Sequence, residues 1–215
     1  MALNHSGNTA KKIKSVNELA GIIRSCRDSG LVVVHCHGVF DLLHLGHLLH
    51  FEAAKREGDV LAVTVTADEF VNRGPGRPIY THEQRACFVA ALECVDFVAI
   101  NYEDSAENLI RKLRPDVYIK GQDYKDAEKD ITRKIFAEKE AVESVGGRIH
   151  FTNEPAMSSS RLINAHFNVY SQEFRELVLE LKRVFNETEL TVFLLELRKR
   201  GVPHSLIKTI TTILK

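Results

Sequence analysis

The sequence predicts an α/β fold of the Rossmann-like type, a doubly wound parallel sheet of about five strands followed by a C-terminal helical extension. Short apolar runs rich in β-branched residues recur along residues 31–151, and stretches of helical periodicity separate them. From about residue 172 onward only helical periodicity remains. Alternating strands and helices favour a parallel sheet with right-handed crossovers and helices on both faces.

The predicted elements can be placed in order along the chain. Residues 1–10 are polar and show no periodicity, and an apolar helical stripe over 16–23 ends at Asp28-Ser29-Gly30. Strands are expected at 31–34, 60–65, 95–100, 116–119 and 148–151. Helices are expected at 45–57, 81–93, 105–113 and 128–145, and another starts near residue 159.

These elements divide the chain into three parts. Residues 1–30 form an N-terminal segment with a leading helix, residues 31–167 form the α/β domain, and residues 168–215 form a helical appendage or linker. Amphipathic stripes over 172–185, 190–197 and 206–214 carry the prediction for the last part. A lid, a dimerisation element and a linker to an absent domain all fit this pattern.

The composition is that of an ordinary globular protein. Lys plus Arg equals Asp plus Glu at 29 each, so no strong net charge draws the chain to nucleic acid or to an anionic membrane. The four cysteines form no CxxC pair, the chain begins without a signal-like segment, and no apolar run approaches the ~20 residues of a membrane span. We therefore expect a cytoplasmic protein with neither nucleic-acid nor membrane partners.

An anion site is predicted where the first strand of the domain meets its helix. Gly38 and Gly46 allow backbone to approach a ligand closely, and free N–H groups at a helix start attract phosphate. His44 and His47 are three residues apart, so both imidazoles can donate to phosphate oxygens from one face. A metal site of His44, His47 and His50 is the alternative, but no carboxylate or cysteine cluster completes it, and we expect no protein-held metal.

The segment Gly38-Val39-Phe40-Asp41-Leu42-Leu43-His44-Leu45-Gly46-His47 resembles the HxGH motif of the cytidylyltransferase-like nucleotidyltransferase superfamily. The resemblance extends over residues 31–166 and is closest to the adenylyltransferase domain of bacterial heptose-phosphate enzymes, with glycerol-3-phosphate cytidylyltransferase next. Its further blocks are Arg77-Pro78, Glu83-Gln84-Arg85, Lys120-Gly121-Gln122-Asp123-Tyr124 and Met157-Ser158-Ser159-Ser160.

The resemblance implies a role for each matched residue. His44 and His47 would stabilise charge on the α-phosphate of a nucleoside triphosphate, and Lys120 would neutralise phosphate charge. The nucleotide-binding residues would be Gly38, Val39, Phe40, Gly46, Gly121, Asp123, Ser158, Ser159 and Ser160. The acceptor-binding residues would be Asp41, Arg73, Arg77 and Arg85.

Several of these residues also have plain structural explanations. Phe40 can be a core residue, Arg85 can lie on a solvated helix face, and the serines can cap a helix. Arg73 and Arg77 can belong to a surface turn, and Lys120 to a β-turn. Arginines stand at 73 and 77 where glycerol-phosphate cytidylyltransferases tend to carry lysines, and Gln122 replaces a glycine usual in heptose-type enzymes. The acceptor therefore stays open at this point.

The implied reaction is transfer of AMP from ATP to a sugar phosphate, which gives an ADP-sugar and pyrophosphate, with Mg²⁺ bridging the triphosphate. Cell-envelope or capsule precursor synthesis is the implied setting, and CTP with a polyol or sugar phosphate is the main alternative.

A fragment of a class I aminoacyl-tRNA synthetase is disfavoured, because the 157–160 block has no lysine and no basic extension follows. A non-catalytic nucleotide-binding regulator is the alternative of another class. Similar enzymes often form homodimers, and a carbohydrate kinase is sometimes fused to them.

Overall fold

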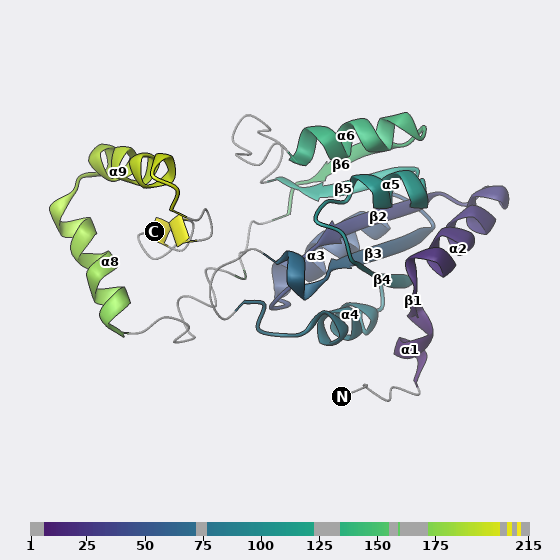
Figure 1. Ribbon diagram of the computed structural model, residues 1–215. Helices are drawn as coiled ribbons and strands as arrows, with labels where there is room; N and C mark the ends of the chain where they lie inside the picture. The colour runs from purple at the N-terminus through teal and green to yellow at the C-terminus, as the bar shows by residue number, and fades with distance from the viewer. Residues whose placement is uncertain are drawn as a thin grey trace. The chain divides into compact units, whose positions relative to one another are not determined.

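The computed structural model describes residues 7–71, 77–122, 134–154, 159, 172–202, 206–207 and 210–211. The chain divides into two compact units, one made from residues 1–70 and 80–157 and the other from residues 71–79 and 158–215. The first unit holds the sheet and the second holds the C-terminal helices (Figure 1).

Six parallel strands form one sheet in the order β1-β4-β3-β2-β5-β6, which confirms the Rossmann-like prediction. The strand that the sequence did not predict is β1, two residues long, which pairs with β4 at one edge. A two-residue strand is too short to produce a periodic pattern, so the expected count of about five was low. The strands are β1 (Ile13–Lys14), β2 (Val33–Gly38), β3 (Val60–Thr66), β4 (Phe97–Asn101), β5 (Val117–Gly121) and β6 (Arg148–Thr152).

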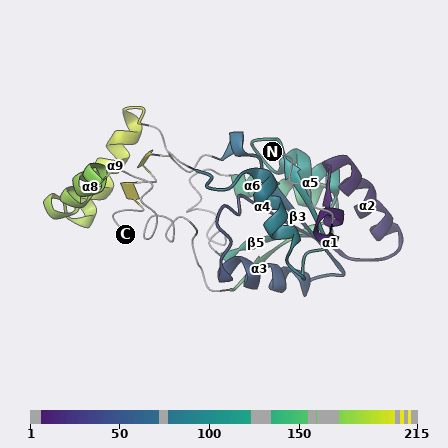
Figure 2. The same cartoon turned by 90° about the horizontal axis from the view of Figure 1, so that it is seen from below.

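Helices cover both faces of the sheet (Figures 1 and 2). One face carries α2, α5 and α6, and its core packs Leu19 and Leu113 against Val33. The other face carries α3 and α4, and its core packs Phe51 and Val89 against β2 and β3. All seven residues of β3 are buried, which explains why the strand is a continuous apolar run in the sequence. The helices of this unit are α1 (Asn8–Lys12), α2 (Val16–Asp28), α3 (Leu45–Lys55), α4 (His82–Ala90), α5 (Glu107–Leu113) and α6 (Lys134–Ser144), with a 3₁₀ turn at Asp68–Phe70.

Local caps fix where the helices start. Ser15 caps α2 and exchanges hydrogen bonds with Glu18, and Thr81 caps α4 and exchanges them with Gln84. Each pair is a capping box, in which two backbone N–H groups without helical acceptors are satisfied reciprocally. The helix α3 begins differently, because its N-cap is the imidazole of His44.

The strand order reverses between β2 and β5. The chain runs outward from β2 through β3 to β4 on one side, whereas β5 and β6 lie on the other side of β2. In open parallel sheets the crevice beyond the carboxyl ends of such strands is the usual ligand site. The loop after β2 carries the predicted anion site to that position.

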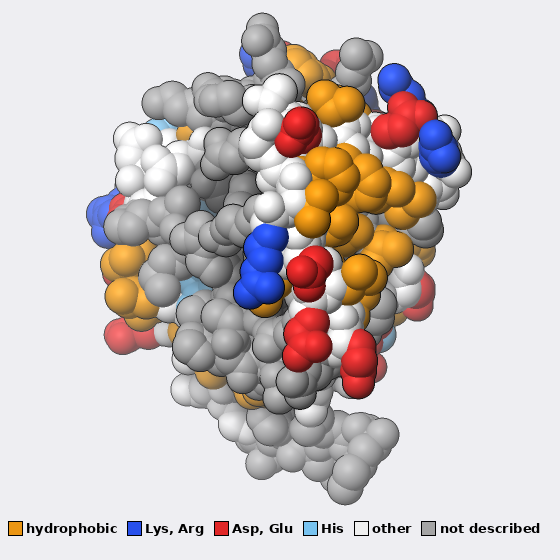
Figure 3. Space-filling view, turned by 90° about the vertical axis from the view of Figure 1, so that its left-hand side faces the viewer, with side chains coloured by type: hydrophobic (Ala, Val, Ile, Leu, Met, Phe, Trp, Pro, Cys, Tyr) orange, Lys and Arg blue, Asp and Glu red, His pale blue; other side chains and the backbone are white. Residues whose placement is uncertain are grey.

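In the part of the second unit that the structure describes, the long helices are α8 (Gln172–Val184) and α9 (Glu187–Lys199). A small apolar cluster of Val178 and Ile210 with Leu190 and Leu194 holds it together. Other large apolar side chains of α8 and α9 are exposed, among them Leu177, Val184 and Val192, and Figure 3 shows a face where hydrophobic side chains gather beside acidic ones. Within the described residues, no helix has both the length and the apolar character needed to cross a membrane.

Candidate functional site

The candidate site lies where β2 and β5 end side by side. Cys36 of β2 pairs with Ile119 of β5, so Gly38 and Gly121 end neighbouring strands at the same edge of the sheet, and Lys120 is the residue before Gly121. The loop of residues 39–44 then leads directly into α3. The geometry thus brings the strand end, the histidine loop and Lys120 to the strand-order reversal.

Phe40 shapes the beginning of this loop. Its φ is 49°, a left-handed conformation that side chains rarely adopt, and its ring is 8% exposed. The ring centroid lies 5.0 Å from that of Phe51 and 5.4 Å, edge to face, from that of His47. A Cβ on Gly38 would come within 2.9 Å of the ring carbon Cζ of Phe40. The ring therefore packs in the core, so any nucleotide contact of Phe40 would be through its backbone.

The two motif histidines stack on each other. The ring centroids of His44 and His47 are 3.8 Å apart, and the ring planes differ by 14°. The backbone N–H of His47 donates to Nδ1 of His44 over 3.3 Å. Because Nδ1 accepts, the proton of a neutral His44 ring is on Nε2. Burial lowers the pKa of His44 from its ordinary value of 6.5, which keeps this ring neutral at pH 7.

The Nε2 atom of His44 is the feature of this site that points to a ligand. It is buried, and no described residue accepts its hydrogen bond. A buried donor without an acceptor costs roughly 1–3 kcal/mol, so such donors in native proteins call for an explanation. A phosphate oxygen bound in the loop would satisfy it.

The start of α3 adds further donors. Leu45 and Gly46 are its first residues, so their N–H groups have no acceptor within the helix. Gly46 is buried, and the helix dipole favours negative charge at this end. The imidazole and the helix start together form a cradle for an anion.

Asp41 is buried beside this cradle at 2% exposure. Its Oδ1 accepts a hydrogen bond from the backbone N–H of Tyr80 over 3.4 Å. The carboxylate therefore links the histidine loop to the segment that precedes α4. Its predicted contact with the acceptor stays a prediction.

The structure does not support an acceptor contact for Arg85. Its side chain is 0% exposed, and its guanidinium donates to the carbonyl oxygens of Tyr80, Val39 and Thr66 and to the carboxylate of Asp68. The ion pair with Asp68 is 2.6 Å long. A buried guanidinium whose three nitrogens all have protein acceptors has little left for a ligand. Arg85 instead joins the loop after β2 to the loop after β3.

Lys120 is present at the site but is already paired. It is 8% exposed, and its Nζ lies 2.7 Å from Oε2 of Glu138 and 5.2 Å from the ring centroid of Tyr118. Glu138 is itself 5% exposed on α6, and it was not among the predicted site residues. The spacing of Glu138 from the buried Ile135 and Val142 places all three side chains on one face of the helix. This spacing is the sequence signal that could have identified Glu138 as a buried residue.

A row of hydrogen-bonded polar side chains on β2 and β3, here called the ladder, was also not predicted from the sequence. The hydroxyl of Thr64 lies 2.8 Å from Nε2 of His35 and 2.9 Å from Nδ1 of His37, and Thr66 lies 3.3 Å from Nε2 of His37. This ladder leads along β2 and β3 to the edge that carries the candidate site. Burial is the main cause that lowers the pKa of His35 to about 3, and the nearby charge of Lys120 adds to it.

His50, the third imidazole of the metal alternative, lies in a different polar contact. Its Nδ1 is 2.9 Å from the hydroxyl of Thr152, and burial, with a smaller effect from Lys120, lowers its pKa to about 4. Among the described residues, the side chains that bring three metal-ligating atoms together are Asp68, His82 and Glu83, within 4.8 Å of one another. Both ring nitrogens of His82 already face these carboxylates, each at 3.1 Å.

The remaining predicted residues are divided among the end of β5, the second unit and the residues that the structure does not describe. Gly121 ends β5, while Arg77 and Ser159 belong to the second compact unit. Arg73, Asp123, Ser158 and Ser160 lie outside the described residues. Their predicted roles stay predictions.

The sequence of this chain is similar to a known family and to known proteins. A family model described as cytidylyltransferase-like matches residues 35–165. The bifunctional protein HldE of Geobacter metallireducens is 38% identical over 176 residues, which cover 80% of this chain and 34% of that protein. HldE of Campylobacter jejuni is 46% identical over 118 residues, or 54% of this chain and 25% of that protein.

Among solved structures, the chain is similar to a lipopolysaccharide core biosynthesis protein from Thermoplasma volcanium. The two are 25% identical with a TM-score of 0.48, over 59% of this chain and 100% of that chain. The present chain spans about a third of the length of curated relatives that it matches. The family match covers more than half of the chain, and it includes the histidine loop, Lys120 and the strands that position them. The chain therefore belongs to the cytidylyltransferase-like family of nucleotidyltransferases.

Proposed function

We propose that this chain transfers AMP from ATP to a sugar phosphate of the heptose-1-phosphate type. The products would be pyrophosphate and an ADP-sugar for envelope or capsule glycan synthesis. Family membership and the similarity to proteins named HldE support the reaction class. The observation that carries the proposal is the buried Nε2 of His44, which has no acceptor among the described residues.

In this reaction an oxygen of the acceptor's phosphate attacks the α-phosphorus of ATP. A new P–O bond forms as the bond from the α-phosphorus to the bridging oxygen breaks, and pyrophosphate leaves. The attacking phosphate is already ionised, so no base is needed to activate it. The requirement is stabilisation of the charge that develops on the α-phosphoryl oxygens, which fixed donors supply without rearrangement.

His44 and the start of α3 meet that requirement in this proposal. The Nε2–H of His44 would donate to an α-phosphoryl oxygen, and the N–H groups of Leu45 and Gly46 would add further donors. His47 would act with His44, because the stacked rings fix each other's orientation. Lys120 would lie beside the phosphates with its charge held by Glu138.

Mg²⁺ would arrive with the triphosphate and bridge its oxygens. The donor set of the cradle fits this division of roles, because N–H groups bind phosphate oxygens and repel a cation. Gly38, Val39, Phe40, Gly121, Asp123 and the serines at 158–160 would contact the nucleotide. Asp41, Arg73 and Arg77 would contact the acceptor.

Transfer of CMP from CTP to a polyol or sugar phosphate is the alternative within the same family. The donors of the cradle would bind phosphate oxygens and would not contact the nucleobase, so they favour neither ATP nor CTP. A regulatory module that binds nucleotide without turnover is the alternative of another class. The intact His44, His47 and Lys120 support turnover instead.

The setting of the reaction is also part of the proposal. The relatives are named bifunctional and are about three times as long as the matched segment, so a second activity such as a carbohydrate kinase would act with this domain. We expect the enzyme in the cytoplasm as a homodimer. The exposed apolar side chains of α8 and α9 are a surface on which two copies could associate.

The test is a pyrophosphate-release assay that crosses ATP, CTP, GTP and UTP with a panel of sugar and polyol phosphates. We expect the highest kcat/KM with ATP and a heptose 1-phosphate. His44→Ala and His47→Ala should each lower kcat by about 10²–10³-fold, as the loss of an oxyanion donor does. Turnover of the wild-type order in both variants would overturn the mechanism. Nucleotide binding without pyrophosphate release for every acceptor would favour the regulatory module.

A further inference from the structure

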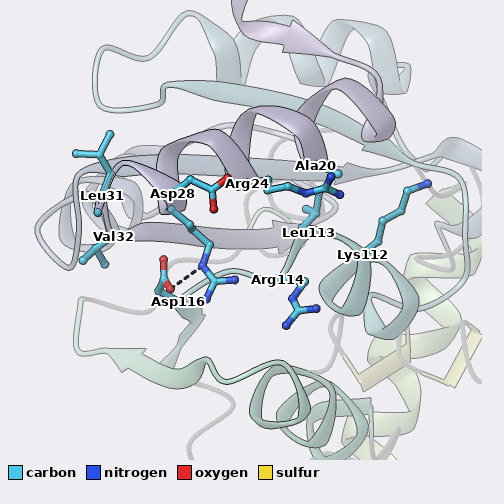
Figure 4. Close-up of a pocket in the computed structure, with 11 residues that line it drawn as sticks. Ala20, Arg24, Asp28, Leu31, Val32, Lys112, Leu113, Arg114 and Asp116 are labelled. Carbon is cyan, nitrogen blue, oxygen red and sulfur yellow. Dashed lines mark hydrogen bonds and ion pairs between the residues drawn. The ribbon is translucent and has the colours of Figure 1, made fainter.

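A cavity lies at the opposite edge of the sheet from the candidate active site, where β2 and β5 begin. It is bounded by the C-terminal half of α2, the turn at 30–32, the end of α5 and the residues that lead into β5 (Figure 4). Its volume is about 730 Å³, within the range of small-molecule sites. The candidate active site lies at the carboxyl ends of the same strands, so the two sites are separate.

The lining of this cavity is cationic. Four basic and two acidic side chains line it, which leaves an excess of two positive charges. One acid is already used, because Asp116 accepts from Nε of Arg27 at 3.0 Å and from the N–H of Val33 at 2.8 Å. The side chains of Arg24, Lys112 and Arg114 have no hydrogen bond or ion pair to any described residue. Three cations with a single remaining carboxylate, Asp28, therefore face the cavity.

Helix stabilisation explains only part of this arrangement. Basic side chains in the last turn of a helix complement its dipole, which accounts for Lys112. Arg24 lies a full turn before the end of α2. Arg114 follows the last residue of α5 with φ 55°, a position where glycine is the usual residue because it carries no Cβ. An arginine at that position is unfavourable for the fold, and a ligand contact would explain why it is present.

The cavity also has an apolar end. Leu31 and Val32 are 40% and 38% exposed, although both are large aliphatic residues. Figure 4 shows them at one end of the cavity, with Arg24, Lys112 and Arg114 at the other end. A ligand that matches both ends has a doubly charged anionic group and a less polar body.

We infer that this cavity is a binding site for a small organic phosphate, separate from the active site. The phosphate dianion would match the two excess positive charges, and the two arginines would bind it through paired N–H···O contacts. The organic part would lie against Leu31 and Val32. The inference does not depend on the proposed AMP transfer.

The experiment is a ¹H–¹⁵N NMR titration of the full chain with phenyl phosphate and, separately, with inorganic phosphate. The backbone N–H signals of Gly30, Val32 and Asp116 report on the cavity, and those of Gly38 and Gly46 report on the active site. A KCl titration at matched ionic strength corrects for general salt effects. We expect saturable shifts at the cavity signals, with phenyl phosphate binding at least threefold more tightly than inorganic phosphate.

Matched variants separate a site from a diffuse positive surface. Arg24→Gln with Arg114→Gln should weaken phenyl phosphate binding at least tenfold at the cavity signals and leave the Gly38 and Gly46 signals unchanged. Arg111→Gln is the control. Arg111 lies on α5, the helix that ends just before Arg114, but its guanidinium donates to the hydroxyl of Ser144 and it does not line the cavity. It should bind as the wild type does. Shifts that stay linear, equal those with KCl or survive the double variant would overturn the inference.

Arg114→Gly supplies a second readout that does not depend on binding alone. Glycine tolerates φ 55° without a Cβ penalty, so this variant should unfold at a higher urea concentration than the wild type. It should also bind phenyl phosphate more weakly. A variant that is more stable yet binds phenyl phosphate as tightly as the wild type would show that Arg114 serves no ligand, and would overturn its place in the site.

Discussion

The loop that carries His44 and the cluster around Arg85 lie at the same edge of the sheet, but they differ in whether their buried polar groups have hydrogen-bond partners. In the loop, the Nε2 of His44 is buried with no acceptor among the described residues. In the Arg85 cluster, each guanidinium nitrogen has a protein acceptor, and the side chain is 0% exposed. Both residues belong to sequence blocks that resemble the same family.

This difference separates groups kept for a ligand from groups used by the fold. A buried polar group stabilises the folded state only when it is paired, and leaving it unpaired costs free energy until a ligand binds. Arg85 should therefore act mainly on stability, and His44 mainly on turnover. Substitutions at the two residues test this division.

The largest effect on stability is expected for Arg85→Ala. The substitution leaves the carboxylate of Asp68 and the carbonyl oxygens of Val39 and Thr66 without their donor, and it opens a cavity in the protein. We expect the free energy of unfolding to fall by about 3–5 kcal/mol, measured by urea denaturation. Arg85→Lys keeps the charge but cannot reach all of these acceptors, so it should lose less.

The same variants test the earlier expectation that Arg85 binds the acceptor. If Arg85→Lys unfolds at the wild-type urea concentration and only its KM for the acceptor rises, Arg85 contacts the acceptor. Arg85 would then be a ligand-binding residue, and the assignment of Arg85 to stability would be wrong. A loss of stability with an unchanged KM in the folded fraction supports it.

For His44, the expected effect is on turnover. His44→Asn removes the imidazole and its Nε2 donor, but asparagine is a good helix N-cap and can still accept from the N–H of His47. We expect kcat to fall by about 10²–10³-fold. The free energy of unfolding should change by less than about 1 kcal/mol. His44→Ala, which also removes the cap, should lose a similar amount of activity and somewhat more stability.

The fold and the site differ in how much of each was predictable. The apolar runs of β2 to β6 and the helical stripes between them are local patterns, so these strands and the helices α2 to α5 were predicted within a few residues, whereas the short helix α1 was not predicted. The HxGH loop was also predictable, because all of its parts lie within ten consecutive residues. What the local pattern does not contain was missed, as with the two-residue strand β1.

The partners of the site residues were not predictable for the same reason. Lys120 and Glu138 meet only after α6 packs on the sheet, and the pattern of a helix surface also suits a solvated glutamate. His35 and His37 stand in a segment whose other residues are apolar, and their hydrogen bonds depend on the register of β2 with β3. The sequence alone also cannot say whether a conspicuous arginine such as Arg85 points toward solvent or into the protein.

The buried imidazoles of His35 and His50 predict that the protein loses stability as the pH falls. Burial lowers the pKa of His35 to about 3 and that of His50 to about 4, from an ordinary 6.5. Below pH 6.5 the unfolded chain binds protons that the folded protein does not, so stability is lost as the pH falls and is retained at neutral pH. Between pH 7.5 and pH 5 each histidine should cost about 2 kcal/mol of unfolding free energy.

His50→Gln tests this prediction. Its amide can still bond Thr152 but cannot titrate, so the variant should lose about 2 kcal/mol less than the wild type between pH 7.5 and pH 5. Urea denaturation at the two pH values measures the difference. Equal losses in the two proteins would show that His50 binds its proton as readily in the folded state as in the unfolded chain, and that burial does not lower its pKa.

The smallest expected effect is that of Gly38→Ala, which links the core to the histidine loop. The added methyl group would come within 2.9 Å of the ring of Phe40, which must move because it is packed against Phe51. We expect a loss of about 1–2 kcal/mol of unfolding free energy from this overpacking. Gly121→Ala is the matched control for stability, since nothing lies within 4 Å of its added Cβ.

Gly38→Ala should also lower kcat, because the ring of Phe40 packs edge to face on His47 and a displaced ring would shift that imidazole. Combining it with Phe40→Leu makes room for the methyl group and should recover part of the stability. It should not recover kcat, because leucine has no aromatic edge to hold His47. If the double variant regained full turnover, the position of His47 would not depend on Phe40. Packing in the core would then not affect the histidine loop. The residues that stabilise the fold and the residues that bind the ligand would be separate sets, although Phe40 contacts both.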